Sequence, residues 1–196
     1  MATIPDSVLV PEDLALERLR PIRRVEYERM VEVGLLTEDD RVELLRGFLV
    51  TMSPQKAPHA GVIERLDRLF QSRLGDRASV RVQLPLALSD DSEPEPDLAL
   101  VTPGDHDETH PRTALLVVEV ADTTLRKDRR IKAALYAAAG IPEYWVVNLL
   151  DRVIEVHAEP GASGYATIAS RSRGQSIRLV TVPDCEIAVA DILRGA

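Results

Sequence analysis

The sequence has one cysteine, few aromatic residues and no long hydrophobic run, and each shortage excludes a class of protein. Because Cys185 stands alone among 196 residues, the chain has no internal disulfide and no zinc cluster of thiolates. No apolar run approaches the roughly 18 to 20 residues that a membrane span needs. The first residues have neither the basic nor the apolar region of a signal peptide. Together these shortages predict a soluble cytoplasmic protein without a membrane segment.

A positive charge excess is also lacking, because the net charge is −8. Proteins that hold nucleic acid by general electrostatics carry a basic excess, so any contact with phosphates here must come from local patches. One patch lies within residues 18–24 and another within residues 126–132, and both are rich in arginine, which suits bidentate phosphate contacts. The candidate substrate contacts in the second patch are Arg126, Lys127, Arg129 and Arg130.

The composition is that of a globular protein, with 45% apolar and 29% charged residues. The length predicts one domain over residues 1–196, which buries roughly 70% of the surface of the unfolded chain. Helical spacing, ended in each case by a glycine, covers residues 24–33, 59–74 and 126–139. Two short strands around Gly47 are expected within 42–53, and others at 80–88, 97–101, 114–121, 144–149, 153–157, 165–170, 176–179 and 186–189. This order predicts an α/β fold with a mixed sheet flanked by helices.

Glu119 lies within the most apolar stretch of the chain, residues 114–121, and burial alone does not explain a carboxylate there. The stretch is rich in β-branched residues and apolar on both alternating faces, as in a central strand covered on both sides. A lone buried carboxylate faces a desolvation cost of several kcal/mol unless a positive group meets it. That group is either a fixed lysine or arginine or a bound metal ion, and the rest of the sequence favours the metal.

A second carboxylate, Asp97, opens the preceding predicted strand. If the two strands are adjacent, opposed side chains on one face lie within roughly 5 Å of each other. Alternation places Asp97 with Ala99 and Glu119 with Val117, so both carboxylates are expected to face the same helix layer. Two close carboxylates repel unless a cation lies between them, and magnesium prefers few protein ligands, with water and substrate phosphate in the remaining positions. Taken alone, Asp97 after a proline is also a common strand-start residue.

Asp128, Lys132 and Tyr136 are spaced at i, i+4 and i+8 in the predicted helix and therefore share a face. Two interpretations are open. The face is exposed and carries an Asp–Lys ion pair worth a few tenths of a kcal/mol, or it turns towards the sheet, where the Lys132 ammonium reaches a metal-bound water or the scissile phosphate. A separate packing stripe is expected from Ile131, Leu135 and Ala138.

Several motifs taken together resemble one family. The chain is similar, over about residues 24–170, to the Uma-two family of restriction endonucleases, a bacterial branch of the PD-(D/E)XK nuclease superfamily. The motifs that carry the resemblance are Val42-Glu43-Leu44-Leu45-Arg46-Gly47, Met52-Ser53-Pro54 with His59, Pro96-Asp97, Val118-Glu119-Val120, the helical set Asp128, Lys132 and Tyr136, and Ala139-Gly140-Ile141-Pro142-Glu143-Tyr144-Trp145-Val146-Val147.

The resemblance implies a restriction-endonuclease-like core over residues 24–170. An N-terminal arm over 1–23 would precede it, and C-terminal strands with a short helix over 171–196 would follow. It also implies a catalytic centre for Mg²⁺, with Mn²⁺ as a substitute. In this chain the metal ligands would be Asp97 and Glu119, with Glu43 as the additional acidic residue.

One position departs from the superfamily motif, which places a lysine two residues after the glutamate, where this chain has Ala121. Lys132 from the next helix is the implied replacement, with Asp128 and Tyr136 as supporting residues near the site. His59 begins a predicted helix, where it either caps the helix or contacts a substrate phosphate. Glu43 is open to two interpretations as well, a metal ligand or a surface strand residue.

Two classes of function follow. The first is a Mg²⁺-dependent endonuclease that hydrolyses phosphodiester bonds of DNA, expected as a homodimer because two-fold nucleases cut both strands in this way. The second is a catalytically silent nuclease-fold module that binds nucleic acid or a protein partner, which Ala121 and the acidic net charge favour. A glycosidase-like pair of acids is a weaker third possibility, since sugar clefts are lined by aromatic residues and aromatics are only 4% here.

Overall fold

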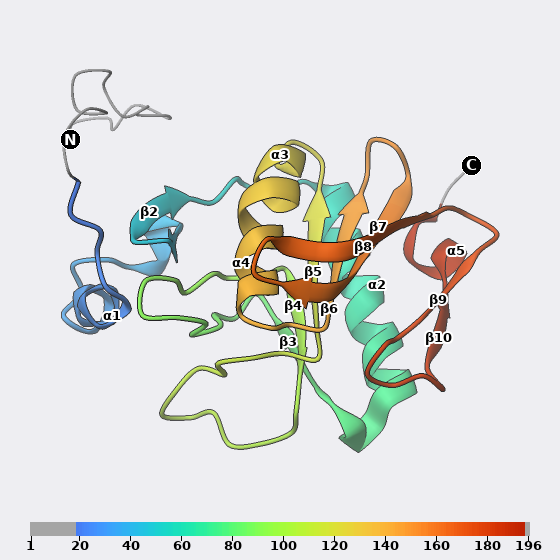
Figure 1. Cartoon of the computed structure of the whole chain (residues 1–196), viewed down its shortest axis with the longest axis horizontal. Helices are drawn as coiled ribbons and strands as arrows, with labels where there is room; N and C mark the ends of the chain where they lie inside the picture. Colours follow the sequence, from blue (N-terminus) through green and yellow to red (C-terminus); the bar gives the residue numbers. More distant parts are fainter. Residues whose placement is uncertain (1–18, 195–196) are drawn as a thin grey trace.

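A six-stranded mixed sheet forms the centre of the computed structural model, which describes residues 19–194 (Figure 1). The strand order is β3-β4-β5-β6-β7-β8, and neighbours are antiparallel except for the parallel pair β5 and β6. This pair is the only crossover among these strands, and its connection carries the helical segment of the predicted site. The strands are β3 (Ser79–Val82), β4 (Leu98–Val101), β5 (Leu116–Ala121), β6 (Glu143–Asn148), β7 (Val153–Gly161) and β8 (Gly164–Arg171).

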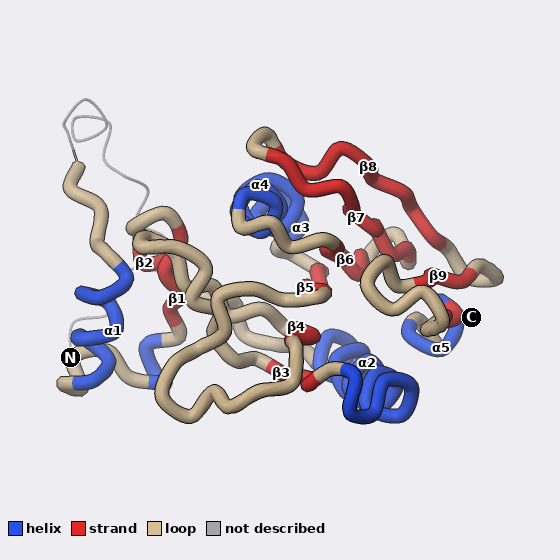
Figure 2. The backbone as a smooth tube through the Cα atoms, turned by 60° about the horizontal axis from the view of Figure 1, so that its bottom comes forward, coloured by secondary structure: helices blue, strands red, loops and turns tan. Residues whose placement is uncertain are grey.

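Helices cover both faces of this sheet (Figure 2). On one face α2 (Ala57–Leu74) and α5 (Val189–Ile192) pack over a core that includes Phe70 and Trp145, whose ring centroids are 5.9 Å apart. On the other face lies the β5–β6 connection, formed by α3 (Leu125–Lys127), a π-helical turn η4 (Asp128–Lys132) and α4 (Ala133–Ala138). Both faces of β5 are therefore buried, as the continuous apolar stretch predicts.

The remaining elements surround this layered core. A separate hairpin of β1 (Val42–Leu45) and β2 (Phe48–Thr51) turns at Gly47, which has φ of 80°. A Cβ at Gly47 would lie 2.3 Å from the Cβ of Pro21, so only glycine allows this close approach. The other elements are α1 (Arg24–Glu32), η2 (Glu38–Asp40), η3 (Gly75–Arg77) and the paired strands β9 (Ser176–Arg178) and β10 (Glu186–Ala188).

The predicted α/β class, with a mixed sheet flanked by helices, is confirmed. The strand predicted at residues 80–88 is too long, because β3 ends at Val82. Gln83 has a positive φ of 51° and Pro85 has no N–H, so the ladder stops there, although Leu86 beyond it is fully buried in a loop. Residues 1–18 of the predicted arm lie outside the described residues. Within residues 19–194, no helix combines the length and the apolar character that a membrane crossing requires.

Glu93 joins the hairpin to the loop that follows β3. Its backbone N–H donates to Leu44 O at 2.8 Å, which ties β1 to this loop. Its side chain is 4% exposed, and its Oε2 atom has no hydrogen-bond partner among residues 19–194. Burial and the nearby Glu28 carboxylate raise the pKa of Glu93 to about 7, although Arg24, 3.9 Å away, opposes the shift.

This shift predicts a pH-dependent stability. Because the folded pKa exceeds the ordinary value of 4.5, the stability that comes from the protonated Glu93 carboxyl is fully present below about pH 4.5 and is lost as the pH rises through about 7. We expect Glu93→Gln to unfold like wild type near pH 4.5, and to be more stable by on the order of 1 to 2 kcal/mol near pH 8. Urea unfolding across this range measures the difference. A difference that does not change with pH would contradict the assigned pKa.

Candidate active site

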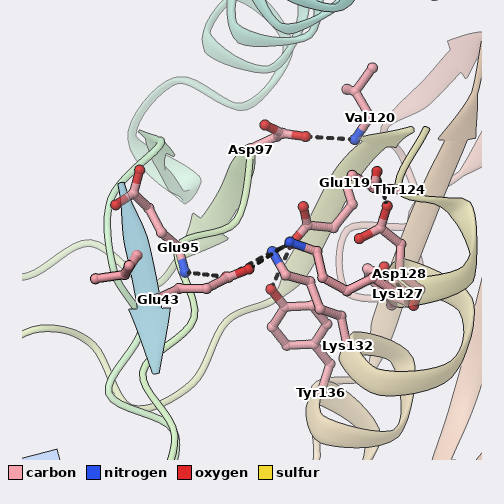
Figure 3. A network of polar contacts seen from close by, with 12 residues as sticks. Glu43, Glu95, Asp97, Glu119, Val120, Thr124, Lys127, Asp128, Lys132 and Tyr136 are labelled. Carbon is pink, nitrogen blue, oxygen red and sulfur yellow. Dashed lines mark hydrogen bonds and ion pairs between the residues drawn. The ribbon is translucent and has the colours of Figure 1, made fainter. Parts of the chain in front are cut away.

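A cavity of about 60 Å³ lies at the edge of the sheet where β4 begins and β5 ends. Its walls come from β1, the segment after β2, the first turn of α2, the loop before β4, the end of β5, α3 and the π-helical turn. Figure 3 shows polar contacts among these elements. The lining is predominantly acidic, with six carboxylates and three cationic side chains. The carboxylates belong to Glu43, Glu95, Asp97, Glu119, Asp122 and Asp128, and the cations to Arg41, Lys127 and Lys132.

Asp97 and Glu119 both line this cavity, as their strand positions predict. β4 and β5 pair with Leu98 opposite Val118, so the next pair along the same register is Asp97 and Glu119. Asp97 is held at the end of the strand, because its Oδ2 accepts the Val120 N–H at 2.7 Å. The structure therefore brings the two predicted carboxylates to one site.

The other Asp97 oxygen contacts His59, whose Nε2 lies 3.0 Å from Oδ1. His59 is in the first turn of α2, and its ring also lines the cavity. Of the two sequence interpretations for His59, a contact at the site fits this position, and the direct partner is the Asp97 carboxylate.

The Glu119 carboxylate is hydrogen-bonded to a lysine and a tyrosine. Its Oε1 accepts hydrogen bonds from Lys132 Nζ and from the Tyr136 hydroxyl, each at 2.8 Å. Its Oε2 accepts no hydrogen bond from the part of the chain that the structure describes. Burial raises the pKa of Glu119 to about 8, with Asp97 among the carboxylates that add to the shift, although Lys132 opposes it. Burial and the neighbouring carboxylates together therefore outweigh the attraction of Lys132.

Lys132 lies between two buried carboxylates and is only 3% exposed. Its Nζ is 2.8 Å from Glu119 Oε1 and 3.0 Å from Glu43 Oε2. Burial lowers the pKa of Lys132, but the attraction of Glu119, Glu43 and Asp128 outweighs burial and raises it above the ordinary value. The ammonium group is therefore charged at neutral pH.

The Glu43 carboxylate forms ion pairs with two lysines. Lys127 Nζ donates to Oε1 at 2.9 Å, and Lys132 lies against Oε2, which also accepts the Glu95 N–H at 3.3 Å. Although burial raises the pKa of Glu43, the two lysines bring it below the ordinary value. No sequence pattern indicated these contacts, since Glu43 and Lys127 are separated by 84 positions. The metal-ligand role of Glu43 stays a prediction, because its oxygens face lysines here.

The helical face of Asp128, Lys132 and Tyr136 turns towards the sheet, and the three side chains are 1%, 3% and 0% exposed. This outcome excludes the interpretation as an exposed ion pair. The segment is not a regular helix as predicted, because Asp128–Lys132 forms a π-helical turn, a feature often found at functional sites. Asp128 is fixed by Thr124, whose hydroxyl donates to Oδ2 at 2.6 Å.

The predicted packing stripe on this helix is wrong for two of its three residues. Ile131 is 42% exposed and Ala138 is exposed, and only Leu135 is buried. The physical reason is that the buried side of the segment carries Lys132 towards the Glu119 and Glu43 carboxylates, so the apolar residues on the opposite side remain in solvent.

The basic patch of the same segment is divided in the structure. Lys127 lines the cavity, whereas Arg129 forms a bidentate ion pair with Glu155, with Nε 2.9 Å from Oε2. Arg126 and Arg130 are exposed and are not part of the cavity lining. The proposed phosphate contacts of these arginines stay predictions.

The carboxylate oxygens at the cavity are of the type that magnesium prefers. Among residues 19–194, no group of three or more histidine, cysteine, aspartate or glutamate side chains is arranged as a complete metal site. Magnesium does not need one, since it is held by one or two carboxylates while water and substrate phosphates fill the other positions. Asp97 and the open Oε2 of Glu119 supply such hard oxygen donors at one cavity.

The protein has an α/β fold with a mixed sheet, and two carboxylates and a buried lysine lie together at one edge of that sheet. Residues 24–190 match the model of the Uma2 family, described as "Putative restriction endonuclease", so the chain belongs to the Uma2 family, as its motifs predicted. The match ends beyond the predicted limit of residue 170. No match was found among curated proteins.

The fold is also that of a solved structure. A crystal structure of "a putative nuclease belonging to DUF820 from Anabaena variabilis ATCC 29413" has a TM-score of 0.68 at 12% sequence identity, covering 88% of this chain and 98% of that chain. At this identity the likeness shows the fold alone, and it agrees with the predicted restriction-endonuclease-like fold. The family supports a nuclease function.

Proposed function

We propose that the protein is a Mg²⁺-dependent endonuclease that hydrolyses phosphodiester bonds of DNA, with Mn²⁺ able to replace Mg²⁺. One observation carries the proposal. Asp97 and Glu119 line one cavity, and the buried Lys132 contacts the Glu119 carboxylate there. The chain belongs to the Uma2 family. The raised pKa of Glu119 supports the proposal, because burial and the neighbouring carboxylates disfavour the charged form of Glu119, and a bound cation would favour that form.

Asp97 and Glu119 would hold the metal. When bound, it polarises the scissile phosphate and lowers the pKa of a bound water. Because Lys132 and the Tyr136 hydroxyl both donate to Oε1 of Glu119, they orient this carboxylate with Oε2 free towards the cavity. A lysine whose pKa is raised does not act as a general base, so Lys132 contributes positive charge, which offsets the charge that develops in the transition state.

The contacts of Glu43 favour a positioning role. Its two oxygens hold the ammonium groups of Lys127 and Lys132, and the hairpin is tied to the loop before β4 through Leu44. Glu43 therefore fixes the lysine that replaces the one missing at Ala121. Asp128, itself fixed by Thr124, adds to the charge that keeps Lys132 protonated.

Cleavage assays test the proposal. The purified protein is incubated with supercoiled plasmid, with labelled duplex and single-stranded DNA, and with RNA of matched sequence, in Mg²⁺, Mn²⁺ or EDTA. We expect nicked and linear plasmid with either metal and intact plasmid in EDTA. RNA cleaved at the rate of DNA would contradict the DNA assignment. The proposal includes a homodimer in the cytoplasm. Light scattering measures the mass of the purified protein and so tests whether it is a dimer.

The alternative is a catalytically silent nuclease-fold module. Ala121 favours this alternative, because it occupies the position of the motif lysine and is fully buried. This alternative predicts no cleavage of any substrate and no heat of Mg²⁺ or Mn²⁺ binding by calorimetry. Metal-dependent cleavage by wild type, together with a heat of metal binding that wild type shows and Asp97→Asn lacks, would exclude the silent module.

A further inference from the structure

The cavity of the candidate active site has two walls that face solvent. The first is the segment between β2 and α2, residues 53–56, and the second is the turn after β5, residues 122–124. All of residues 53–56 are exposed, and the first three of them line the cavity. Residues 122–124 line it as well, and Thr123 is exposed. The inner side of the cavity is buried, because Glu119 and Lys132 are 5% and 3% exposed.

One ion pair connects the two solvent-facing walls. Lys56 Nζ donates to Asp122 Oδ2 at 2.9 Å. Among residues 19–194, this is the only hydrogen bond or ion pair between the two walls. The Lys56 side chain is 65% exposed and that of Asp122 is 23% exposed, so water and salt screen the pair. An exposed pair of this kind shifts an equilibrium by at most about fivefold, so it breaks at low cost.

The segment of residues 53–56 has few other ties to the protein. Residues 53–55 form no backbone hydrogen bond within residues 19–194. Bonded chain lies directly before and after them, since the Met52 N–H donates to Arg41 O at 2.7 Å and the Ala60 N–H donates to Lys56 O at 3.1 Å. A segment with few backbone hydrogen bonds opens locally at a small cost in free energy. The wall can therefore move while β2 and α2 stay in place.

A nucleic-acid substrate needs more room than the cavity has. The volume of about 60 Å³ holds a few water molecules. A phosphodiester carries a sugar on each side, and ligand sites commonly have about 300 to 1,000 Å³. Because Glu119 is 5% exposed, a phosphate reaches its carboxylate only if a wall of the cavity moves. The wall with the fewest hydrogen bonds is the one that moves at the lowest cost.

We propose that residues 53–56 form a strap that opens to admit the substrate strand, and that the Lys56–Asp122 ion pair is the latch that closes the strap. This inference rests on the proposed function, because it states how the substrate reaches that site. Closing after entry excludes water and holds the phosphate near the carboxylates. Lys56 and Asp122 act here by positioning the strap, and neither of them touches the reacting atoms.

The distance between two spin labels measures the opening without any cleavage. Nitroxides are attached at Gln55→Cys and Thr123→Cys, one exposed position on each wall, and EPR spectroscopy records their separation in EDTA. Cys185 is 3% exposed, and wild type treated with the label gives the background. In this labelled protein, Lys56→Glu places two negative charges at the latch. The matched control is Lys56→Arg, which keeps the positive charge.

We expect Lys56→Glu to raise the population with the longer label separation by roughly twofold to fivefold, because the latch is lost. Lys56→Arg should match the protein with Lys56. Added salt should raise the same population when Lys56 is present, since it screens the ion pair, but not in Lys56→Glu. Equal label distances with Lys56 and in Lys56→Glu, or an equal change in Lys56→Arg, would overturn the latch.

A removable cross-link tests whether opening is needed for cleavage. Lys56→Cys/Asp122→Cys is joined by a short bifunctional methanethiosulfonate, which a reducing agent removes. The control is Glu64→Cys/Arg68→Cys on the exposed side of α2, where the native ion pair of 3.0 Å lies within one helix. We expect plasmid cleavage by the cross-linked latch variant to fall roughly tenfold or more and to recover on reduction, whereas the control keeps its rate.

The two measurements separate the strap from the proposed function. If no form of the protein cleaves nucleic acid while the labels move apart in Lys56→Glu, the proposed function fails and the latch is confirmed. If wild type cleaves DNA with Mg²⁺ and the cross-link between the two walls leaves the rate unchanged, the strap fails and the proposed function does not.

Discussion

Replacing Glu119 by glutamine should abolish metal-dependent cleavage while the protein remains folded. The amide keeps an oxygen for Lys132 and Tyr136 but removes the charge that a cation requires. Metal coordination contributes several kcal/mol to phosphodiester hydrolysis, so we expect the single-turnover rate to fall on the order of 10³-fold or more. Asp97→Asn should behave in the same way, because this carboxylate lines the same cavity from the neighbouring strand.

The control for this prediction is Glu93→Gln, which also removes a buried carboxyl. Glu93 is 4% exposed and Glu119 is 5% exposed, but Glu93 lies outside the cavity lining. We expect Glu93→Gln to cleave at the wild-type rate, and titration calorimetry to show Mg²⁺ binding in wild type and Glu93→Gln only. If Glu119→Gln and Asp97→Asn cleave as fast as wild type, the assignment of the two carboxylates is wrong.

The convergence of Asp97 and Glu119 was predictable because it depends on a short-range rule. Side chains alternate with a period of two along a strand, so the sequence tells which residues share a face. The prediction then needed only that the two strands be neighbours, and they are connected directly and pair in antiparallel register. The apolar composition of β5 likewise indicated a central strand, and both faces of β5 are buried.

The direction of the Lys132 face was not predictable in the same way. Helical spacing shows that Asp128, Lys132 and Tyr136 share a face, but it does not show whether that face meets solvent or the sheet. The sequence left both orientations open, and it placed the packing stripe on Ile131, Leu135 and Ala138, of which Ile131 is exposed. The tertiary contact with Glu119 and with the distant Glu43 decides the orientation, and no local pattern contains that information.

The loop between β3 and β4 shows a second limit of prediction from the sequence. Leu86 and Ala87 are apolar and buried, as in a strand, yet they belong to irregular chain whose backbone hydrogen bonds go to other loop residues. The Leu86 N–H donates to Pro94 O at 3.0 Å and the Ala87 N–H donates to Pro111 O at 2.9 Å. Apolar composition alone does not separate such a loop from a strand, because a buried loop and a strand covered on both faces both contain consecutive buried apolar residues.

Lys132→Met should lower both stability and activity, and it should separate the role of the lysine from that of the metal. Without the ammonium group, Glu119 and Glu43 lose a partner in a buried site. We expect the free energy of unfolding to fall by about 3 to 5 kcal/mol in metal-free buffer, the cost of leaving a buried charge unpaired. Chemical unfolding with EDTA measures this loss, and Mg²⁺ should restore part of it because a cation offsets the same carboxylates.

The matched control is Lys127→Met, since Lys127 also contacts Glu43, at 2.9 Å, but its side chain is 20% exposed. We expect this control to lose at most about 1 kcal/mol. At a temperature where both variants are folded, Lys132→Met should bind Mg²⁺ at least as tightly as wild type, because a competing positive charge is gone. Its single-turnover cleavage should nevertheless be roughly 10²-fold to 10³-fold slower, the usual loss for one group that stabilises the transition state. Wild-type cleavage by Lys132→Met would show that the ammonium group only balances buried charge, and weaker Mg²⁺ binding would show that it shapes the metal site instead of the reaction.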